Sequence, residues 1–414
     1  MDKRVLFLVL FIVFCAGVPA IAQTCQIQNS GTTDDFKGVA FTDSLHGWAV
    51  GGGNNGGSIF CTTDGGTTWN QQPLPQQEFG LYRVAMSNPQ FGWAVGMEGT
   101  ILHTSDGHTW EQQDLGITAG CLDVAFPNDS TGWIMGGALE NGWDVRRTTD
   151  RGATWVAQPV GQVSHQKGFV FADATTGWMV GYSGSIMRTT DGGSTWEQQP
   201  CANTGYLFDG AFTNANTGWV VGYEGAILHT TDGGDTWIQQ TSGSTAYLSA
   251  AAFTANTTGW VVGDGGTILR TENGGDTWEN QPSGTTAFLS DVTFLNNGMG
   301  WAVGSSGTIL RYTPPAPDQV KSATAIPGDF FLAPNFPNPF NPGTTLRFGV
   351  PQAADVSLEV FDMLGRKVAT LRDGIAQPGV HSVSWTCPGC ASGTYLARLR
   401  YAGRTLQQPM LLLK

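Results

Sequence analysis

The sequence predicts an all-β fold made of repeated four-stranded units. A Gly-Trp pair recurs at intervals of 45, 40, 45, 41, 41 and 41 residues, with Trp48, Trp93, Trp133, Trp178, Trp219, Trp260 and Trp301. Each unit holds short apolar runs between Gly, Asn, Asp and Thr turns, with no helix-length segment. Four strands in about 41 residues are typical of a propeller blade, so we expect a seven-bladed β-propeller over residues 23–313.

The chain termini predict how this propeller closes. The seventh unit runs into Pro314 and Pro315 before a fourth strand can form. The segment "TCQIQNSGTTDDFKGVAF" at 24–41 aligns without gaps with "TWIQQTSGSTAYLSAAAF" at 236–253. We therefore expect residues 25–28 to be the outer strand of the last blade, which removes an open sheet edge.

A second motif, "TTDGGTTW" at 62–69, returns five times in altered form. Its acid falls in the turn between the third and fourth strands, where a carboxylate accepts backbone N–H bonds and the following Trp packs between blades. A buried indole in every blade suits a core, whereas a ligand platform needs a few aromatic rings in one place. We therefore expect a structural role for Asp64, Asp106, Asp150, Asp191, Asp232 and Asn273.

Candidate ligand-binding residues lie where the units differ. The first strand of each blade should line the central channel, and one position on it reads Gly38, Arg83, Asp123, Gly168, Asp209, Ala250 and Asp291. The charged members Arg83, Asp123, Asp209 and Asp291 suit a cation, a peptide or a sugar, or they only hydrate the channel. Loops at 51–58 and 136–145 are enlarged on the face opposite the repeated acids, and the second displays Trp143 beside Asp144.

A column of mostly basic residues precedes the Thr of each acidic turn. Its members are Cys61, His103, Arg147, Arg188, His229, Arg270 and Arg311. They would either face an acidic partner or pair with carboxylates of the blades.

Several function classes find little support. The net charge of -13 without a basic run argues against nucleic acid as a partner. No HExxH or GxSxG element occurs, and no carboxylate pair stands out beyond Asp123, Asp209 and Asp291. The sequence therefore favours a non-enzymatic protein with no cofactor and no metal.

The first 22 residues have the composition of an export signal. Lys3 and Arg4 precede an apolar run that ends in Ala20, Ile21 and Ala22. We expect cleavage before Gln23 and no transmembrane segment in the mature chain.

The C-terminal part has a different composition. Residues 314–329 form a Pro-rich linker, and alternating runs in 330–414 predict a small immunoglobulin-like β-sandwich of about seven strands. Within it, "CPGC" is expected to be a local disulfide or two free thiols rather than a redox site.

The repeats resemble a known class of propeller. The acidic turn resembles the Asp-box, or BNR repeat, of sialidases, sortilin-type receptors and some glycoside hydrolases. The fuller unit, with "GWAVG" followed by text like "GTILRTTDGGTTW", resembles the photosystem II stability/assembly factor type of seven-bladed propeller. This resemblance implies the fold more strongly than the function.

The tail resembles the type A C-terminal sorting domain of the type IX (Por) secretion system. The motifs are "NFPNPFNPGTTLRF", "LEVFDMLGRKVATL", "GVHSVSW" and "ASGTYLARL", in that order. The resemblance implies passage through the periplasm, recognition by the type IX secretion machinery, and a secreted or surface-attached product.

These observations lead to one main hypothesis and two alternatives. The main one is a secreted or cell-surface, non-enzymatic binding scaffold whose ligand is an extracellular glycan or protein. The first alternative is a glycoside hydrolase of sialidase or xyloglucanase type. The second is a protein like the photosystem II assembly factors.

Overall fold

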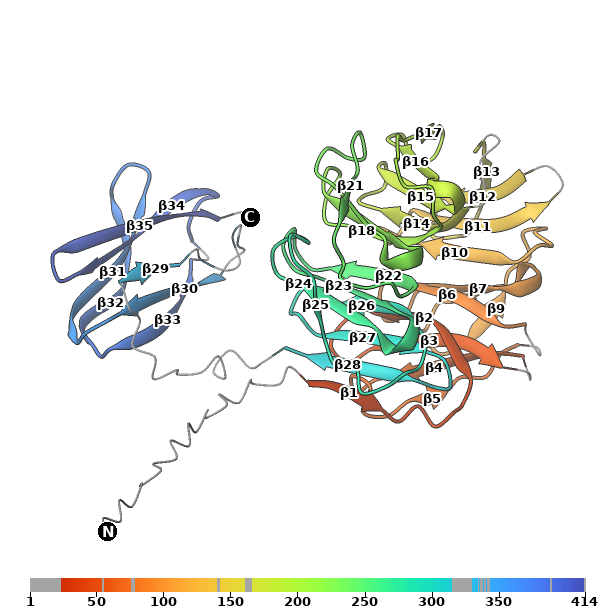
Figure 1. Ribbon diagram of the computed structural model, residues 1–414, viewed down its shortest axis with the longest axis horizontal. Coiled ribbons are helices and arrows are strands. Elements are labelled where there is room, and N and C mark those ends of the chain that lie inside the picture. Colours follow the sequence, from red (N-terminus) through yellow and green to blue (C-terminus); the bar gives the residue numbers. More distant parts are fainter. Residues whose placement is uncertain are drawn as a thin grey trace, which may run out of the picture. The chain divides into compact units, whose positions relative to one another are not determined.

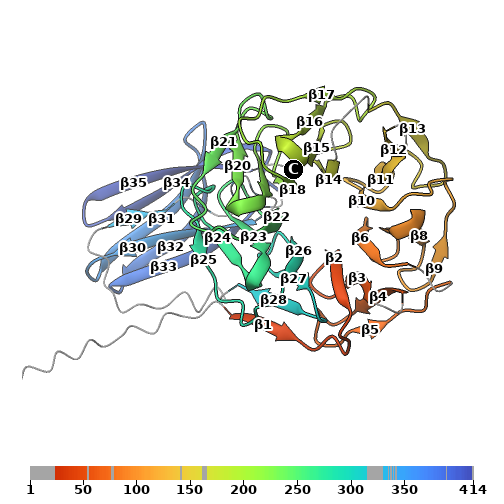
Figure 2. The ribbon, with the colours of Figure 1, turned by 45° about the vertical axis from the view of Figure 1, so that its right-hand side comes forward.

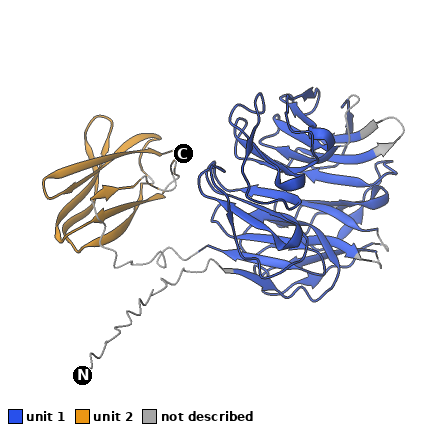
Figure 3. Cartoon of the chain, viewed as in Figure 1, with its two compact units in different colours: residues 1–314 blue, residues 315–414 orange. Residues whose placement is uncertain are grey.

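The computed structural model describes residues 24–53, 56–75, 79–139, 142–160, 166–314, 330–333, 335, 338, 340, 343–387 and 389–412. They form two compact units, which divide between Pro314 and Pro315 (Figure 3). The expected export signal and residues 315–329 of the expected linker lie outside the described residues.

The first unit consists of seven four-stranded antiparallel sheets, which we number as blades 1 to 7 in chain order (Figure 1). Blade 1 contains β2 (Asp35–Phe41), β3 (Gly47–Gly53), β4 (Gly56–Thr62) and β5 (Asn70–Gln71). Blade 2 contains β6 (Leu81–Met86), β7 (Gly92–Gly96), β8 (Ile101–Thr104) and β9 (Trp110–Gln112). Blade 3 contains β10 (Cys121–Ala125), β11 (Gly132–Leu139), β12 (Gly142–Thr148) and β13 (Val156–Gln158).

Blades 4 to 6 repeat the same order of strands. Blade 4 contains β14 (Gln166–Phe171), β15 (Gly177–Gly181), β16 (Ile186–Thr189) and β17 (Glu197–Gln198). Blade 5 contains β18 (Leu207–Phe212), β19 (Gly218–Gly222), β20 (Ile227–Thr230) and β21 (Ile238–Gln240). Blade 6 contains β22 (Leu248–Phe253), β23 (Gly259–Gly263), β24 (Ile268–Thr271) and β25 (Glu279–Asn280). Single 3-10 turns follow the second strand in four blades: η1 (Met97–Gly99), η2 (Tyr182–Gly184), η3 (Tyr223–Gly225) and η4 (Asp264–Gly266).

Blade 7 takes its outer strand from the start of the chain. It contains β26 (Leu289–Phe294), β27 (Gly300–Gly304) and β28 (Ile309–Thr313), and β1 (Thr24–Gln28) pairs with β28. Cys25 lies opposite Tyr312, so β1 occupies the position that the sequence alignment predicted. Figure 2 shows the sheets arranged in a ring, with the first strand of each blade nearest its centre.

The second strand of each blade forms the buried middle of the packing. In blade 5 all five residues of β19, "GWVVG", are buried because neighbouring blades cover both faces of the strand. The Gly-Trp indoles contribute most: Trp93, Trp133, Trp178, Trp219 and Trp301 are each less than 2 % exposed. Burial of an indole in each blade interface is therefore the main apolar contribution to this unit.

The second unit has two sheets around one hydrophobic core. One sheet contains β29 (Phe331–Leu332), β30 (Gly343–Val350) and β33 (Gly379–Thr386), and the other contains β32 (Lys367–Ala376), β31 (Ala354–Asp362), β34 (Gly393–Tyr401) and β35 (Arg404–Leu412). Leu346, Phe348, Leu358 and Leu399 are fully buried in the shared core. Cys387 and Cys390 form a disulfide, the first of the two states expected for "CPGC".

None of the described helices is long and apolar enough to span a membrane.

Candidate functional site

The Asp-box acids are hydrogen-bonded within their own turns. In blade 5 the Asp232 carboxylate accepts the Thr236 hydroxyl at 2.6 Å and the Thr236 backbone N–H at 2.9 Å. These bonds favour the ionised acid and lower the pKa of Asp232 to about 2. Thr230 completes the turn by donating its hydroxyl to Asp232 and accepting the Gly234 N–H, both at 2.8 Å.

The same arrangement recurs in the other blades that carry the motif. The side chains that accept the equivalent backbone N–H are Asp64, Asp106, Asp150, Asp191 and Asn273. Because each carboxylate already accepts hydrogen bonds from its own turn, it is poorly placed to bind a ligand. This is the geometry that a structural role requires.

Two indoles join neighbouring blades at every interface except that of blades 6 and 7. Trp178 of blade 4 donates its Nε1–H to the Gly233 carbonyl of the Asp-box in blade 5, at 3.0 Å. It also stacks on Phe212, with ring centroids 3.4 Å apart, and the edge of Trp237 meets the same phenyl ring. Indole-to-glycine bonds of this kind also start from Trp48, Trp133, Trp219 and Trp301.

The mostly basic column covers these indoles. Strand pairing places Arg147 opposite Trp133, with its guanidinium 5.5 Å from the ring centroid. His229 lies opposite Trp219 and stacks on it at 4.6 Å. Of the two expectations, pairing with a carboxylate is seen for Arg188 with Asp235 and for Arg270 with Glu272. The larger role, which the sequence reasoning missed, is to cover the tryptophan of the same blade.

The structure brings together the four charged residues predicted for the channel. Arg83 projects from β6, and the three acids project from β10, β18 and β26. The Arg83 guanidinium lies 2.7 Å from Asp291, 3.7 Å from Asp123 and 3.8 Å from Asp209. We call these four side chains the central cluster.

Each acid of the central cluster also bonds to the next blade. Asp123 accepts the Phe169 N–H at 2.7 Å, Asp209 accepts the Ala251 N–H at 3.1 Å, and Asp291 accepts the Val39 N–H at 2.9 Å. The last of these bonds connects blade 7 to blade 1. The acids are therefore held by a counter-ion and by backbone donors together.

Small residues between the charged positions allow this close approach. A Cβ added to Gly168 would lie 3.0 Å from the Phe208 carbonyl and 3.5 Å from Asp123 Oδ2. A Cβ on Gly38 would lie 2.9 Å from the Arg83 Cα. Gly38 and Gly168 are thus required sterically, because any side chain there would collide with the first strand of the next blade or crowd a carboxylate of the central cluster.

Burial changes the protonation of the central cluster. It raises the pKa of Asp123 to about 6 and that of Asp209 to about 7, and the nearby Arg83 opposes both shifts. Desolvation lowers the pKa of Arg83, but the fields of Asp291, Asp209 and Asp123 outweigh it and raise the pKa overall. Arg83 stays charged, whereas two of the acids titrate near neutrality.

The other two candidate residues lie on the enlarged hairpin of blade 3. Asp144 on β12 accepts two bonds from the Arg146 guanidinium, at 2.8 and 2.9 Å, so it is paired within its own strand and not with Arg83. Trp143 also lies on β12, but its side chain is outside the described residues. The enlarged loop at 51–58 contributes the long hairpin of β3 and β4.

Sequence reasoning assigned no role to a group of tyrosines at the end of the ring where the first strands begin. Tyr182 of η2 and Tyr223 of η3 flank Tyr206, with ring centroids 4.4 and 6.2 Å from it. Tyr206 and Tyr223 are 48 % and 49 % exposed. The sequence contained a signal for these tyrosines. The turn after the second strand reads "GYSG" in blade 4 and "GYEG" in blade 5, whereas it reads "GDGG" in blade 6 and "GSSG" in blade 7.

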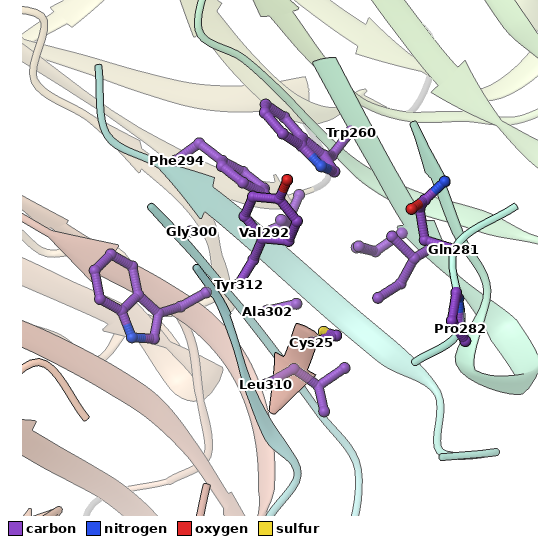
Figure 4. Close-up of a pocket in the computed structure, with 13 residues that line it drawn as sticks. Cys25, Trp260, Gln281, Pro282, Val292, Phe294, Gly300, Ala302, Leu310 and Tyr312 are labelled. Atoms are coloured by element: carbon purple, nitrogen blue, oxygen red, sulfur yellow. The ribbon is translucent and has the colours of Figure 1, made fainter. Parts of the chain in front are cut away.

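Blade 7 lacks an Asp-box, and an apolar pocket lies where its indole would pack (Figure 4). Cys25 lies opposite Tyr312, as Trp110 lies opposite Thr104 in blade 2. Tyr312 replaces part of the contact that the Asp-box indole makes in the other blades, because its ring centroid lies 5.6 Å from that of Phe294. Because thirteen mostly apolar core residues line this pocket, we assign it to the interface of blades 6 and 7 and not to the central cluster.

No group of three or more metal-ligating side chains comes together in the part of the chain that the structure describes. In the central cluster the three carboxylates surround the Arg83 guanidinium, which is the positive charge at the point where they meet.

Sheets joined by Asp-box turns and inter-blade indoles define a BNR-type β-propeller. The family model described as "Photosynthesis system II assembly factor YCF48" matches residues 20–115, 163–242 and 238–313, which is more than half of the chain. The chain belongs to this family.

The curated relatives match only over short stretches. The chain is 38% identical over 65 residues to "Photosystem II stability/assembly factor HCF136, chloroplastic" of Cyanidioschyzon merolae, which is 16% of this chain and 14% of the relative. It is 39% identical over 72 residues to "Photosystem II assembly lipoprotein Ycf48" of Synechococcus sp., which is 17% of this chain and 20% of the relative. The matches thus span at most a fifth of these relatives.

Solved structures share the fold at low identity. "YCF48 bound to D1 peptide" has a TM-score of 0.60 at 22% identity over 70% of this chain and 95% of that one. YCF48 from Cyanidioschyzon merolae has a TM-score of 0.59 at 17% identity over 70% and 99%. PorZ, a surface component of the type IX secretion system of Porphyromonas gingivalis, has a TM-score of 0.54 at 14% identity over 92% of this chain and 60% of PorZ.

Proposed function

We propose that the chain is a non-enzymatic binding propeller that is exported across the outer membrane by its C-terminal unit and then secreted or held at the cell surface. The observation that carries the non-enzymatic part is the position of Arg83. It pairs with all three acids of the central cluster, and each acid also binds a backbone N–H of the next blade. Acid and base catalysis needs carboxylates free to exchange protons with a substrate.

Export by a type IX system is supported by the motifs of the tail and by the separate core of the second unit. The motif "LEVFDMLGRKVATL" covers β31, its turn and the start of β32, and "ASGTYLARL" leads into β34. A fold shared with PorZ over most of the chain is consistent with this assignment.

The export proposal is tested by fractionating cells of the source organism. A chain that lacks residues 330–414 should accumulate in the periplasm, whereas the full chain reaches the surface or the medium. A reporter protein with residues 1–30 in front of it and 314–414 behind it should follow the full chain, which separates export from propeller folding. Appearance of the truncated chain in the medium would refute the proposal.

The binding proposal is tested with the full mature chain on glycan and peptide arrays. Trp143→Ala is the first variant to examine, because Trp143 lies on an enlarged hairpin and outside the two repeated tryptophan positions. Release of reducing sugar from a polysaccharide panel would instead establish the glycoside hydrolase.

A second candidate is assistance to photosystem II assembly, which the family membership and the fold shared with the D1-peptide complex support. It predicts binding of a D1 peptide to this chain. Absence of binding at peptide concentrations that saturate the YCF48 of the D1-peptide complex would remove it.

A further inference from the structure

The tyrosines described above belong to a larger aromatic belt on blades 4 to 7. At the position just before the buried start of the first strand, blades 5, 6 and 7 have Tyr206, Tyr247 and Phe288. Blades 1, 2 and 3 have Asp35, Gly80 and Gly120 at the same register, although blade 2 carries an exposed ring, Phe79, one residue earlier. The belt is therefore defined by the contacts between its rings and not by one repeated position.

The rings of the belt touch one another across blades. Phe208 stacks on Tyr247 at 4.1 Å, and Tyr247 meets the edge of Phe288 at 5.5 Å. Tyr182 lies close enough to Tyr247 to help raise its pKa to about 12, after the larger effect of burial. Tyr206 and Phe208 flank Leu207 at the start of β18, so the two groups of rings adjoin in blade 5. They form one surface, made of Tyr182, Tyr206, Phe208, Tyr223, Tyr247 and Phe288.

Core packing does not account for this surface. Tyr206 and Tyr223 each expose about half of their area, and the other four rings are only partly buried. An exposed, contiguous aromatic surface in a soluble protein is typical of an interaction site. The central cluster lies close to it in the sequence, because Asp209 on β18 and Asp291 on β26 each follow three residues after Tyr206 and Phe288, which precede these strands.

A polar groove adjoins the aromatic belt. It is lined by Glu224, the residue after Tyr223, by Gly225, and by residues 239–245, "QQTSGST". Apart from Glu224, its side chains are amides and hydroxyls. The surface thus offers aromatic faces for stacking beside uncharged hydrogen-bonding groups.

We propose that the aromatic belt and its polar groove bind an uncharged glycan chain. The C–H groups on one face of a pyranose ring carry partial positive charge and suit the negative face of a tyrosine, while its hydroxyls suit the amides and hydroxyls of the groove. The net charge of -13 opposes an anionic polysaccharide. A cationic ligand is disfavoured at Tyr182, because the Lys167 ammonium already lies 5.0 Å from the centroid of this ring.

This inference rests on the proposed binding function and names its ligand class. It is tested by affinity electrophoresis of the full mature chain in gels with hydroxyethyl cellulose, xyloglucan, glucomannan or laminarin, and with alginate as the anionic probe. We expect retardation by at least one neutral polysaccharide. Tyr206→Ala with Tyr223→Ala should weaken this binding at least tenfold.

Two controls separate stacking from folding. Tyr206→Phe with Tyr223→Phe keeps both rings and should keep most of the affinity. Ile238→Ala changes a side chain that is 68 % exposed on β21, outside the belt, and should have no effect. Thermal unfolding of each variant shows that the fold is retained.

Three results would overturn the inference: no retardation by any neutral polysaccharide, retardation by alginate alone, or unchanged binding by the double alanine variant. Capture of an envelope protein that depends on Tyr206 and Tyr223 would also reject a glycan at this surface, but it would leave the proposed binding function in place. Failure of the export test has no bearing on this result, because the gels use purified protein.

Discussion

At the scale of single residues, Arg83 is the counter-ion for three acids. Arg83→Met keeps most of the side-chain volume but leaves Asp123, Asp209 and Asp291 without a positive charge. Removal of one partner from a buried ion pair typically costs about 3–5 kcal/mol, so we expect the free energy of unfolding at pH 7.5 to fall by roughly 3 kcal/mol. Urea denaturation measures this change.

Lys37→Met is the matched control for Arg83→Met. Lys37 is an exposed partner of Asp35, and its loss should cost less than about 1 kcal/mol. Equal destabilisation by both substitutions would show that Arg83 is not the counter-ion of the cluster.

The shifted acids also predict how stability depends on pH. The folded pKa values of Asp123, about 6, and Asp209, about 7, lie above the ordinary value of 3.8. Between these limits the native state binds more protons than the unfolded chain, so the free energy of unfolding falls as pH rises. We expect the propeller to be more stable at pH 5 than at pH 7.5, by on the order of 4 kcal/mol.

Asp209→Asn tests this explanation, because the amide does not titrate. The difference in unfolding free energy between pH 5 and pH 7.5 should shrink by about two thirds in this variant, because Asp209 has the larger pKa shift. A protein that is as stable at pH 7.5 as at pH 5 would contradict the raised pKa values. The Asp-box acids do not interfere, because their lowered pKa values affect stability only below about pH 4.

At the scale of the elements, the threonine that opens the Asp-box is the buried part of the turn. Thr230 is 2 % exposed and accepts the buried Gly234 N–H. Thr230→Val keeps the shape but leaves that donor unpaired, which should cost about 1–3 kcal/mol in chemical denaturation. Thr241→Val, at an exposed position, should change stability by less than about 0.5 kcal/mol.

The interface of blades 6 and 7 is a second test at this scale. Tyr312→Thr restores the residue type found opposite the Asp-box tryptophan, but it enlarges the pocket in Figure 4 and should destabilise the protein by about 2–4 kcal/mol. Adding Cys25→Trp supplies the indole that other blades place there. We expect the double variant to recover at least half of the loss, as a double-mutant cycle in urea would show. A double variant no more stable than Tyr312→Thr would contradict the equivalence of Cys25 and the Asp-box tryptophans.

Much of this architecture could be predicted because a repeat fixes the register of every strand. That register placed Arg83, Asp123, Asp209 and Asp291 at one level of the ring, and it placed Cys25 on the outer strand. It could not show that the acids accept N–H groups from neighbouring blades, because a register shift beside Asp123, Asp209 and Asp291 changes the local backbone direction. The aromatic belt was missed because its rings come from turns and strand starts that the consensus treats as variable.

At the scale of the whole molecule, the ring depends on contacts between residues far apart in the sequence. β1 pairs with β28, and the Asp291 carboxylate on β26 accepts the Val39 N–H of β2; both contacts join residues more than 250 positions apart in the sequence. Blade 7 is therefore joined to blade 1 by a shared strand on the outside and by a side-chain bond near the centre. The second unit has its own core, and none of its described strands belongs to a blade sheet.

Deletion of the first strand should consequently destabilise the propeller, whereas deletion of the second unit should leave its stability unchanged. Removing residues 24–28 leaves β28 as an unpaired edge and uncovers the side of blade 7 on which Cys25 packs, so we expect a lower Tm and concentration-dependent aggregation. Removing 330–414 should leave the Tm of the propeller within about 2 °C of that of the full chain, because the two units have separate cores. Scanning calorimetry and size-exclusion chromatography measure both effects. If the first deletion left the propeller as stable and monomeric as the second, the outer strand would not hold the ring together, and closure would rest on Asp291 and the buried faces of blades 7 and 1 alone.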